Sequence, residues 1–175
     1  MTRATSIFHI QNLPIALMLF CTSAFGLDSD RDQPIKIQAD TAVVNDTDGS
    51  SVYRGNVIIT QGTLEVRADE VEISTADSVV IQIIAKTDKG SSMLAHYQQQ
   101  TNAEKDMVIA DARKITYLVQ EKRLHLSGSA RLQQINNVFT GELLYYDIGK
   151  GIVSLNSGGG SGRVNITINP RKSSQ

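Results

Sequence analysis

The chain has 175 residues, of which 41% are hydrophobic and 20% charged, and it contains no tryptophan. This composition is typical of a globular domain and excludes both a disordered tail and a polytopic membrane protein. The net charge of −1, from 17 basic and 18 acidic residues, argues against a nucleic-acid-binding protein, which would carry a basic excess. A single cysteine excludes an intramolecular disulfide and a thiolate metal cluster.

The first part of the chain, residues 1–26, has the pattern of a secretory signal peptide. Arg3 is the only charged side chain before Asp28, an apolar run covers 13–20, and small residues end the segment at Gly26. A basic start, a short apolar core and small residues at the cut are typical of a cleaved leader. An uncleaved anchor is the alternative, although the apolar run is short for a membrane span.

Cleavage after Gly26 would leave a mature chain with no cysteine and a net charge one unit more negative than the full chain, because Arg3 and Cys21 lie in the leader. We expect one β-domain over 27–170 and a short tail over 171–175. Export without disulfides is compatible with a bacterial periplasm.

After the leader, apolar and polar residues alternate with a period of two, which predicts antiparallel strands with one packed face. These runs cover 53–60, 64–69, 71–73, 115–119, 124–126, 130–133 and 164–168. Turn-forming residues separate them at 45–49, 87–90 and 148–151. No stretch shows clear helical periodicity, so the predicted fold class is all-β. The alternation changes phase at Asp69-Glu70, which predicts a bulge or corner there.

A weak internal repeat links the two halves of the chain. The segment from Gly55 to Gln61 resembles the segment from Gly128 to Gln134, 73 residues further on. Small-acidic steps flank both copies, at Ala39-Asp40 and Ala68-Asp69 in one and at Ala110-Asp111 and Gly141-Glu142 in the other. The repeat indicates duplicated strand units stacked in series, and chance similarity of short strands is the alternative.

Catalytic and metal-binding patterns are weak. The expected mature chain keeps only His96 and His125, and neither belongs to a closely spaced pair. The run Asp28–Asp32 begins like a calcium loop, but Gln33 and Ala39 stand where glycine and glutamate are needed. We therefore expect no metal and no cofactor.

Two further patterns could suggest chemistry. The glycine-rich segment 158–162 has no predicted helix after it, so it reads as a loop and not as a phosphate cradle. Asp69, Glu70 and Glu72 could supply paired carboxylates for glycoside hydrolysis, but surface charges around a bulge explain them as well. A non-enzyme is the favoured interpretation, and a periplasmic glycan-cleaving domain is the enzyme alternative.

Apolar strands lie at both ends of the predicted array. Ile35 and Ile37 begin it, and Val164, Ile166 and Ile168 end it. An open sheet has unpaired N–H and C=O groups at its end strands, which are a template for pairing with another chain. The alternative is that these strands are covered within one molecule.

Six blocks of the sequence carry a further pattern: Asp32–Asp40, Gly55–Leu64 and Ala68–Val71 in the first half, and Ile115–Tyr117, Leu126–Ala130 and Leu132–Gln134 in the second. In this order they resemble the LptA/OstA family of periplasmic lipopolysaccharide-transport proteins. The likeness extends from about Asp30 to Ile168. The Gln-Pro-Ile block and the Gly-Asn-Val…Gln-Gly block are specific together, and each alone is weak.

The resemblance implies an open, twisted antiparallel β-jellyroll (OstA-like) with exposed terminal edge strands. It also implies head-to-tail homo-oligomers that bridge an LptC-like inner-membrane component and an LptD-like outer-membrane translocon. Lipopolysaccharide would move along an apolar groove that holds the lipid A acyl chains. The inner-membrane transporter would consume the ATP, so no nucleotide site is needed here.

Six residues are the candidates for this groove: Ile35, Ile37, Val57, Ile59, Tyr117 and Val119. Three of them match the family's blocks and the other three follow from the alternation, with ordinary core packing as the alternative for all six. Because the mature chain is acidic and lipopolysaccharide head groups are anionic, we expect binding to depend little on salt. The competing function is a monomeric, closed β-barrel carrier of another apolar ligand.

Overall fold

A computed structural model describes residues 30–101, 106–159 and 162–169, so the predicted leader, its cleavage site and the tail lie outside the described residues. The all-β prediction is confirmed, with a single 3-10 turn, η1 (Asp30–Asp32), ahead of the strands. The strands are β1 (Lys36–Gln38), β2 (Thr41–Asn45), β3 (Ser50–Gln61), β4 (Leu64–Ala76), β5 (Val79–Lys86), β6 (Ala95–Gln100), β7 (Met107–Ala112), β8 (Lys114–Leu118), β9 (Arg123–Gln134), β10 (Asn137–Asp147), β11 (Ile152–Asn156) and β12 (Asn165–Thr167). No helix among these residues is long and apolar enough to cross a membrane.

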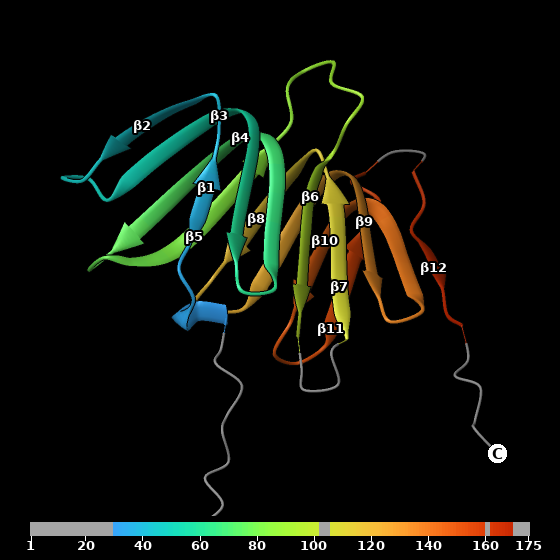
Figure 1. Ribbon diagram of the computed structural model, residues 1–175. Helices are drawn as coiled ribbons and strands as arrows, with labels where there is room; N and C mark the ends of the chain where they lie inside the picture. The colour runs from blue at the N-terminus through green and yellow to red at the C-terminus, as the bar shows by residue number, and fades with distance from the viewer. Residues whose placement is uncertain (1–29, 102–105, 160–161, 170–175) are drawn as a thin grey trace, which may run out of the picture.

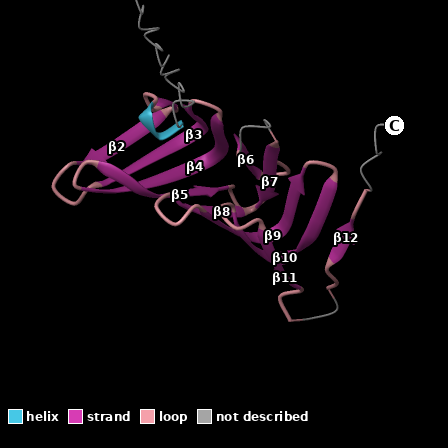
Figure 2. Cartoon of the chain, turned by 90° about the horizontal axis from the view of Figure 1, so that it is seen from below, coloured by secondary structure: helices cyan, strands magenta, loops and turns pink. Residues whose placement is uncertain are grey.

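All strand pairs are antiparallel and they form two walls that share the four long strands. Wall A has the order β2-β3-β4-β5-β8-β9-β10-β11. Wall B has the order β1-β3-β4-β6-β7-β9-β10-β12. Each of β3, β4, β9 and β10 gives one half to each wall. In both views β2 and β12 lie toward opposite ends of the molecule (Figures 1 and 2).

The walls meet along a crease that is built by two β-bulges. In β3, Gly55 and Asn56 stand opposite the single residue Asp69 of β4, so the ladder resumes with Val57↔Ala68. Both bulge residues have positive φ, 77° for Gly55 and 47° for Asn56. The predicted irregularity at Asp69-Glu70 is therefore present, but the extra residue lies on the partner strand β3.

The same bulge recurs in the second half of the chain. Gly128 and Ser129 of β9, with φ of 79° and 53°, stand opposite the single residue Glu142 of β10. The predicted repeat is thus a repeat of structure. One detail of the predicted alignment is wrong, since the counterpart of Asp40 is Arg113 and not Asp111.

Backbone hydrogen bonds establish that correction. The Asp40 N–H donates to the Gly55 carbonyl at 3.0 Å, and the Arg113 N–H donates to the Gly128 carbonyl at 2.8 Å. Asp40 directly precedes β2 and Arg113 directly precedes β8, which is the first wall A strand of the second half of the chain. The misalignment by two residues arose because strands have a period of two, so short Ala-Asp steps match equally well at either register.

The core fills the space between the walls. Its fully buried members come from both, including Val66 and Leu132 of wall B and Val71 and Leu124 of wall A. Among the described residues, no polar or charged residue is fully buried in this cluster apart from tyrosine. The phase change of β4 lets Leu64 and Val66 point inward before the crease and Val71 and Ile73 point inward after it. The two walls therefore enclose one apolar interior.

Candidate functional site

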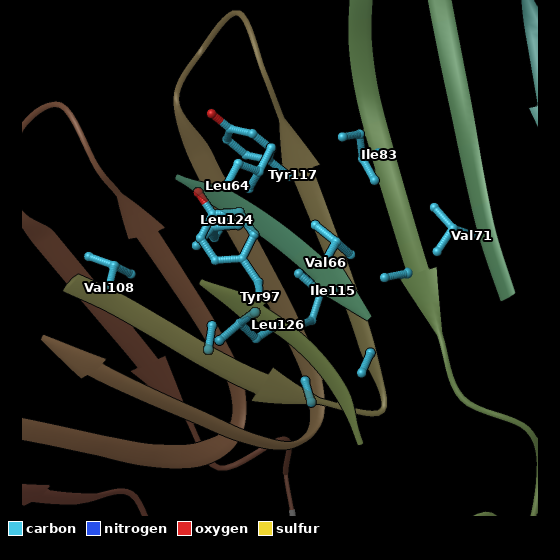
Figure 3. Packing of buried hydrophobic residues seen from close by; sticks show 14 of the residues in the cluster. Leu64, Val66, Val71, Ile83, Tyr97, Val108, Ile115, Tyr117, Leu124 and Leu126 are labelled. Carbon is cyan, nitrogen blue, oxygen red and sulfur yellow. The ribbon is translucent and has the colours of Figure 1, made fainter. Parts of the chain in front are cut away.

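The apolar interior is the concave feature that the fold creates. It is closed in the middle of the molecule by side chains that meet across the walls (Figure 3). Tyr97 of β6 and Tyr117 of β8 pack edge to face with ring centroids 5.4 Å apart. They are 0% and 5% exposed, so no open channel passes this point.

The interior opens at the end of the molecule that carries β1 and β2. A cavity of about 710 Å³ lies between Ile35, Ile37 and the free ends of the wall A strands. Its apolar lining also includes Val44, Tyr53, Ile73 and Val80. We call this cavity the N-terminal mouth. Its volume falls in the range of ordinary small-ligand sites, and its lining continues directly into the core.

The rim of the N-terminal mouth is acidic. Asp46 and Asp48 come from the β2–β3 turn and Asp77 from the β4–β5 turn, and all three line the cavity and are exposed. Among the residues that the structure describes, no lysine or arginine lines the cavity. The site can therefore receive an apolar group, but it offers an anionic head group no counter-charge.

The structure divides the six predicted groove residues into three pairs. Ile35 and Ile37 line the N-terminal mouth, where Ile35 is 38% exposed and Ile37 is partly buried. Val57 and Ile59 are 1% and 0% exposed inside wall B. Tyr117 is buried in wall A, and Val119, just after β8, packs against the core and bonds through its N–H to the Ile81 carbonyl.

Five of the six pack in or against the core, Ile35 only lines the mouth, and Ile35 and Ile37 are the two that reach the cavity. Sequence reasoning missed four cavity residues, Val44, Tyr53, Ile73 and Val80. Tyr53 shares the inward alternation of Val57 and could have been found from it. Val44 and Val80 could not, because each directly follows another valine, so the sequence does not show which of the two adjacent valines faces inward.

Of the three carboxylates that could have suggested catalysis, Asp69 accepts a hydrogen bond from the Asp88 backbone N–H at 2.9 Å, and the other two form ion pairs on the outside of wall A. Glu70 accepts from Arg54 Nε at 2.6 Å, and Glu72 accepts from Lys86 Nζ at 2.5 Å. The hydrogen bond from Glu72 raises the pKa of Lys86, because it favours the charged ammonium. This arrangement is a surface ion network and presents no free acid–base pair to a cleft.

A second polar cluster lies on the outside of wall B, where the two halves of the chain meet. His96 Nδ1 of β6 lies 2.8 Å from Asp111 Oδ1 of β7, and Arg131 of β9 approaches the other carboxylate oxygen at 3.5 Å. The Asp111 hydrogen bond raises the pKa of His96, and the His96 hydrogen bond lowers the pKa of Asp111. No group of three or more candidate metal ligands is present among the described residues.

Two buried tyrosine hydroxyls differ in their partners. The Tyr97 hydroxyl donates to Gln99 Oε1 at 2.5 Å, and burial raises its pKa well above the usual value. The Tyr146 hydroxyl has no hydrogen-bond partner among the described residues. Burial also raises the pKa of Tyr146, so both groups stay neutral in the interior.

These features define a class of protein. The molecule is an open, creased, jellyroll-like β-sheet with an apolar interior, an apolar mouth at one end and unpaired edges at both ends. Such a scaffold holds an apolar ligand or pairs with other sheets, and Glu70, Glu72, His96 and Asp111 form ion pairs on its outer faces.

Comparison with known proteins identifies the family. The family described as LptA/(LptD N-terminal domain) LPS transport protein matches residues 36–152. The chain belongs to this family of lipopolysaccharide transport proteins, which is not a family of known enzymes. The resemblance found in the sequence is confirmed.

Individual relatives agree with that assignment. The lipopolysaccharide export system protein LptH of Pseudomonas aeruginosa is 34% identical over 158 residues, which cover 87% of this chain and 88% of that protein. The lipopolysaccharide export system protein LptA of Escherichia coli K12 is 30% identical over 137 residues, which cover 77% and 72%.

A solved structure has the same fold. The crystal structure of LptH, the LptA-homologous periplasmic component of the conserved lipopolysaccharide transport device of P. aeruginosa, superposes with a TM-score of 0.71 at 32% identity. The match covers 82% of this chain and 100% of that one.

Proposed function

We propose that this protein binds lipopolysaccharide by its lipid A acyl chains and carries it across the periplasm, from an inner-membrane export complex to an outer-membrane translocon. The observation that carries the proposal is the apolar interior with its mouth at Ile37 and Tyr53, in a member of a lipopolysaccharide transport family. The periplasmic location rests on the leader-like residues 1–26 and on the periplasmic relative LptH.

The energetics favour such a carrier. Each CH₂ group kept from water is worth about 0.8 kcal/mol, so several acyl chains cannot cross an aqueous space unshielded. An apolar lining without a specific polar trap lets a chain slide between equivalent positions. Val57 and Ile59 are fully packed without ligand, so acyl chains would enter at the mouth and advance as the two walls separate.

The partners follow from the free edges. At one end β1 and β2 each pair with β3 on one side only, and at the other end β11 and β12 each pair with β10 on one side only. An LptC-like inner-membrane component, an LptD-like translocon and further copies of this chain could each add strands there. A bridge of head-to-tail copies would extend the apolar interior from one membrane to the other.

The alternative of a closed monomeric carrier is less favoured by the sheet order. A closed barrel has no edge strands, whereas four strands here have a free side among the described residues. A glycan-cleaving activity is also less favoured, because Glu70 and Glu72 are paired with Arg54 and Lys86 on the outer face.

Site-specific photocrosslinking tests the lipid proposal. A benzophenone amino acid replaces Tyr53 at the mouth or Tyr117 in the interior, and purified lipopolysaccharide is added before irradiation. Tyr145 is the matched control, since it is also a wall A tyrosine but is 47% exposed and packs edge to face with His125. We expect lipid adducts at Tyr53 and Tyr117 only. Lipid adducts at Tyr145 equal to those at Tyr53 and Tyr117, or no adducts at any position of a folded protein, would contradict the proposal.

A further inference from the structure

The two halves of the chain repeat each other residue for residue over most of their strand pairs. Adding 73 to the numbers of the β2–β3 ladder, Thr41↔Arg54 to Asn45↔Ser50, gives the β8–β9 ladder, Lys114↔Ser127 to Leu118↔Arg123. The same shift turns the β1–β3 ladder into the β7–β9 ladder, for example Ile37↔Ile59 into Ala110↔Leu132.

The ends of the two halves correspond in the same way. Residues 82–86 of β5 pair with β4 in the same way as residues 152–156 of β11 pair with β10. This part of β5 therefore corresponds to β11. Likewise β6 corresponds to β12, because Val66↔Tyr97 in the first half becomes Phe139↔Ile166 in the second. The chain is therefore a tandem of two similar units, β1–β6 and β7–β12.

The two units are joined inside the molecule by two strand pairs. In wall A, β5 of the first unit pairs with β8 of the second, from Gln82↔Leu118 to Lys86↔Lys114. In wall B, β6 pairs with β7, with Tyr97↔Ala110 at its centre. We call these two pairs the internal joint. Its four strands have counterparts in the four free edges, namely β11, β2, β12 and β1.

We propose that two copies of this chain join in the register of the internal joint, so that β11 and β12 of one copy pair at the same time with β2 and β1 of the next. This inference deepens the proposed function, on which it rests for the head-to-tail contact, by fixing the residues of that contact. The wall A pairs are Ile152↔Asn45, Val153↔Val44, Ser154↔Val43, Leu155↔Ala42 and Asn156↔Thr41. The wall B pairs are Asn165↔Gln38, Ile166↔Ile37 and Thr167↔Lys36.

Side-chain facing provides an independent check of this register. Val153 and Leu155 pack against the core, and their proposed partners point inward too, since Val44 lines the mouth and Ala42 lies opposite the core residue Tyr53. After a slip by one residue, every inward-facing residue would lie opposite an outward-facing residue of the other copy.

Wall B passes the same check. Ile37 packs against the core, and Ile166 lies opposite Phe139, which also packs against it. The register derived from backbone ladders alone thus brings apolar inward residues together in both walls. The apolar interior would continue without a break from one copy to the next.

Exposure marks the same edges. Most of the large hydrophobic side chains that are exposed lie on or beside the four free strands: Ile35, Val43, Val44, Ile152, Val164, Ile166 and Ile168. Continued for one more residue, the wall B register also places Ile35 opposite Ile168. Exposed apolar edges favour aggregation unless another strand covers them, and a second copy covers both edges of an end together.

The joint between copies differs from the internal joint in charge. The His96↔Asp111 pair of the internal joint corresponds to Asn165↔Gln38 between copies, which is uncharged. Association should therefore respond little to salt, whereas it should be sensitive to substitution of the inward apolar pairs.

Disulfide trapping tests the register. In a chain with Cys21→Ser, single-cysteine variants are mixed in pairs and oxidised. Val43→Cys with Ser154→Cys and Asn45→Cys with Ile152→Cys are the matched pairs, and the swapped pairs are the controls. All four positions are exposed and alternate with the inward residues Val44 and Val153. Each cysteine therefore serves once in a matched and once in a mismatched mixture.

The geometry gives a sharp expectation. Directly opposed residues have Cα atoms about 4.5–5.5 Å apart, whereas residues displaced by two lie about 7–8 Å apart, beyond the reach of a disulfide. We expect about tenfold more mixed dimer from matched pairs. Wall B is tested with the matched pairs Lys36→Cys with Thr167→Cys and Gln38→Cys with Asn165→Cys, and with their swapped controls.

The outcomes separate this inference from the lipid proposal. Matched products in both walls support the register even if no lipid labels Tyr53. Equal yields from matched and swapped mixtures, products in one wall only, or no mixed dimer at all would overturn it, even if lipid labels Tyr53 and Tyr117. Circular dichroism of each variant checks that the chain is folded.

Discussion

His96 and Asp111 are the residues through which charge stabilises the internal joint. Their contact spans β6 and β7, the two strands that connect the repeated units in wall B. Arg131 supports Asp111 from β9, and Arg67 on β4 opposes the charge on His96. Both side chains are about one quarter exposed, so the contribution is modest, about 0.5–1 kcal/mol.

The pH dependence of this pair has a definite sign. The pKa of His96 is raised above 6.5, so its contribution is complete below that pH and is lost as pH rises through the folded pKa. The pKa of Asp111 is lowered below 3.8, so its contribution is lost only as pH falls through that lower value. We expect urea unfolding to give a coupling free energy between His96→Gln and Asp111→Asn at about pH 5.5 that shrinks at about pH 8.5. The same coupling at both pH values would contradict the assignment.

The bulge glycines are the second case at the residue scale. An added Cβ at Gly55 would lie 2.8 Å from the Asp40 Cβ, and one at Gly128 would lie 2.8 Å from the Arg113 Cβ. Gly151 has a similar positive φ of 67° but open space around it. We expect Gly151→Ala to lower the free energy of unfolding by about 1 kcal/mol, from φ strain alone.

Gly55→Ala and Gly128→Ala add a steric clash to the same strain, so each should cost at least about 2 kcal/mol in urea unfolding. The two losses should be similar, because the bulges are equivalent. If either variant matched Gly151→Ala, the close packing at the crease would not contribute to stability.

At the scale of strands, alternation revealed those elements that have one consistent phase. Strands β3, β8, β9 and β12 were found within a few residues, whereas β6, β7 and β10 were not. β10 changes phase at the bulge position Glu142, which hides its period of two. Sequence gave no means to pair β5 with β8 or β6 with β7, because these ladders depend on how the crease folds one wall over the other.

The six groove residues stay a prediction as a lipid-binding set. Three came from the family's blocks and three from the period of two, and neither source could tell packed residues such as Ile59 from cavity residues such as Ile37. That difference depends on which strands end beside a residue in the assembled sheet, since Ile37 lines the cavity together with the ends of β2, β4 and β5. The exposed edges were predicted correctly, because apolar strands at both ends of an open array have no internal partner.

Strand β2 provides a direct test of edge pairing. Val43 and Val44 are 63% and 60% exposed, but Val44 faces the interior and Val43 faces outward. Val44→Lys would place a charge in the apolar joint between copies, whereas Val43→Lys would leave it in water. We expect only Val44→Lys to reduce the concentration-dependent increase in mass in sedimentation experiments, by about tenfold in association constant.

Both variants should change the free energy of unfolding of a single copy by no more than about 0.5 kcal/mol, since both side chains are exposed. Equal loss of association in the two variants would mean that β2 does not pair in the proposed orientation. Unchanged association in both would mean that this edge stays free.

The whole molecule combines an apolar interior with an acidic rim around the N-terminal mouth. Asp46, Asp48 and Asp77 line the N-terminal mouth, and the full chain has a net charge of −1. A lipopolysaccharide head group is anionic, so its attraction to this end cannot come from opposite charge. Affinity in the proposed complex would come from acyl chains leaving water, a contribution that salt does not screen.

The expected consequence is a binding constant that does not weaken between about 0.01 M and 0.15 M salt, measured by calorimetry or fluorescence with purified lipopolysaccharide. Replacing the three rim carboxylates by Asn should leave the affinity equal or make it tighter at low salt, because it removes repulsion without changing the apolar lining. Val80→Asp, which places a charge on that lining, is the opposite variant and should weaken binding at every salt concentration. A steep loss of affinity with salt would point instead to a basic head-group site elsewhere on the molecule, and the acidic mouth would then not be the entrance.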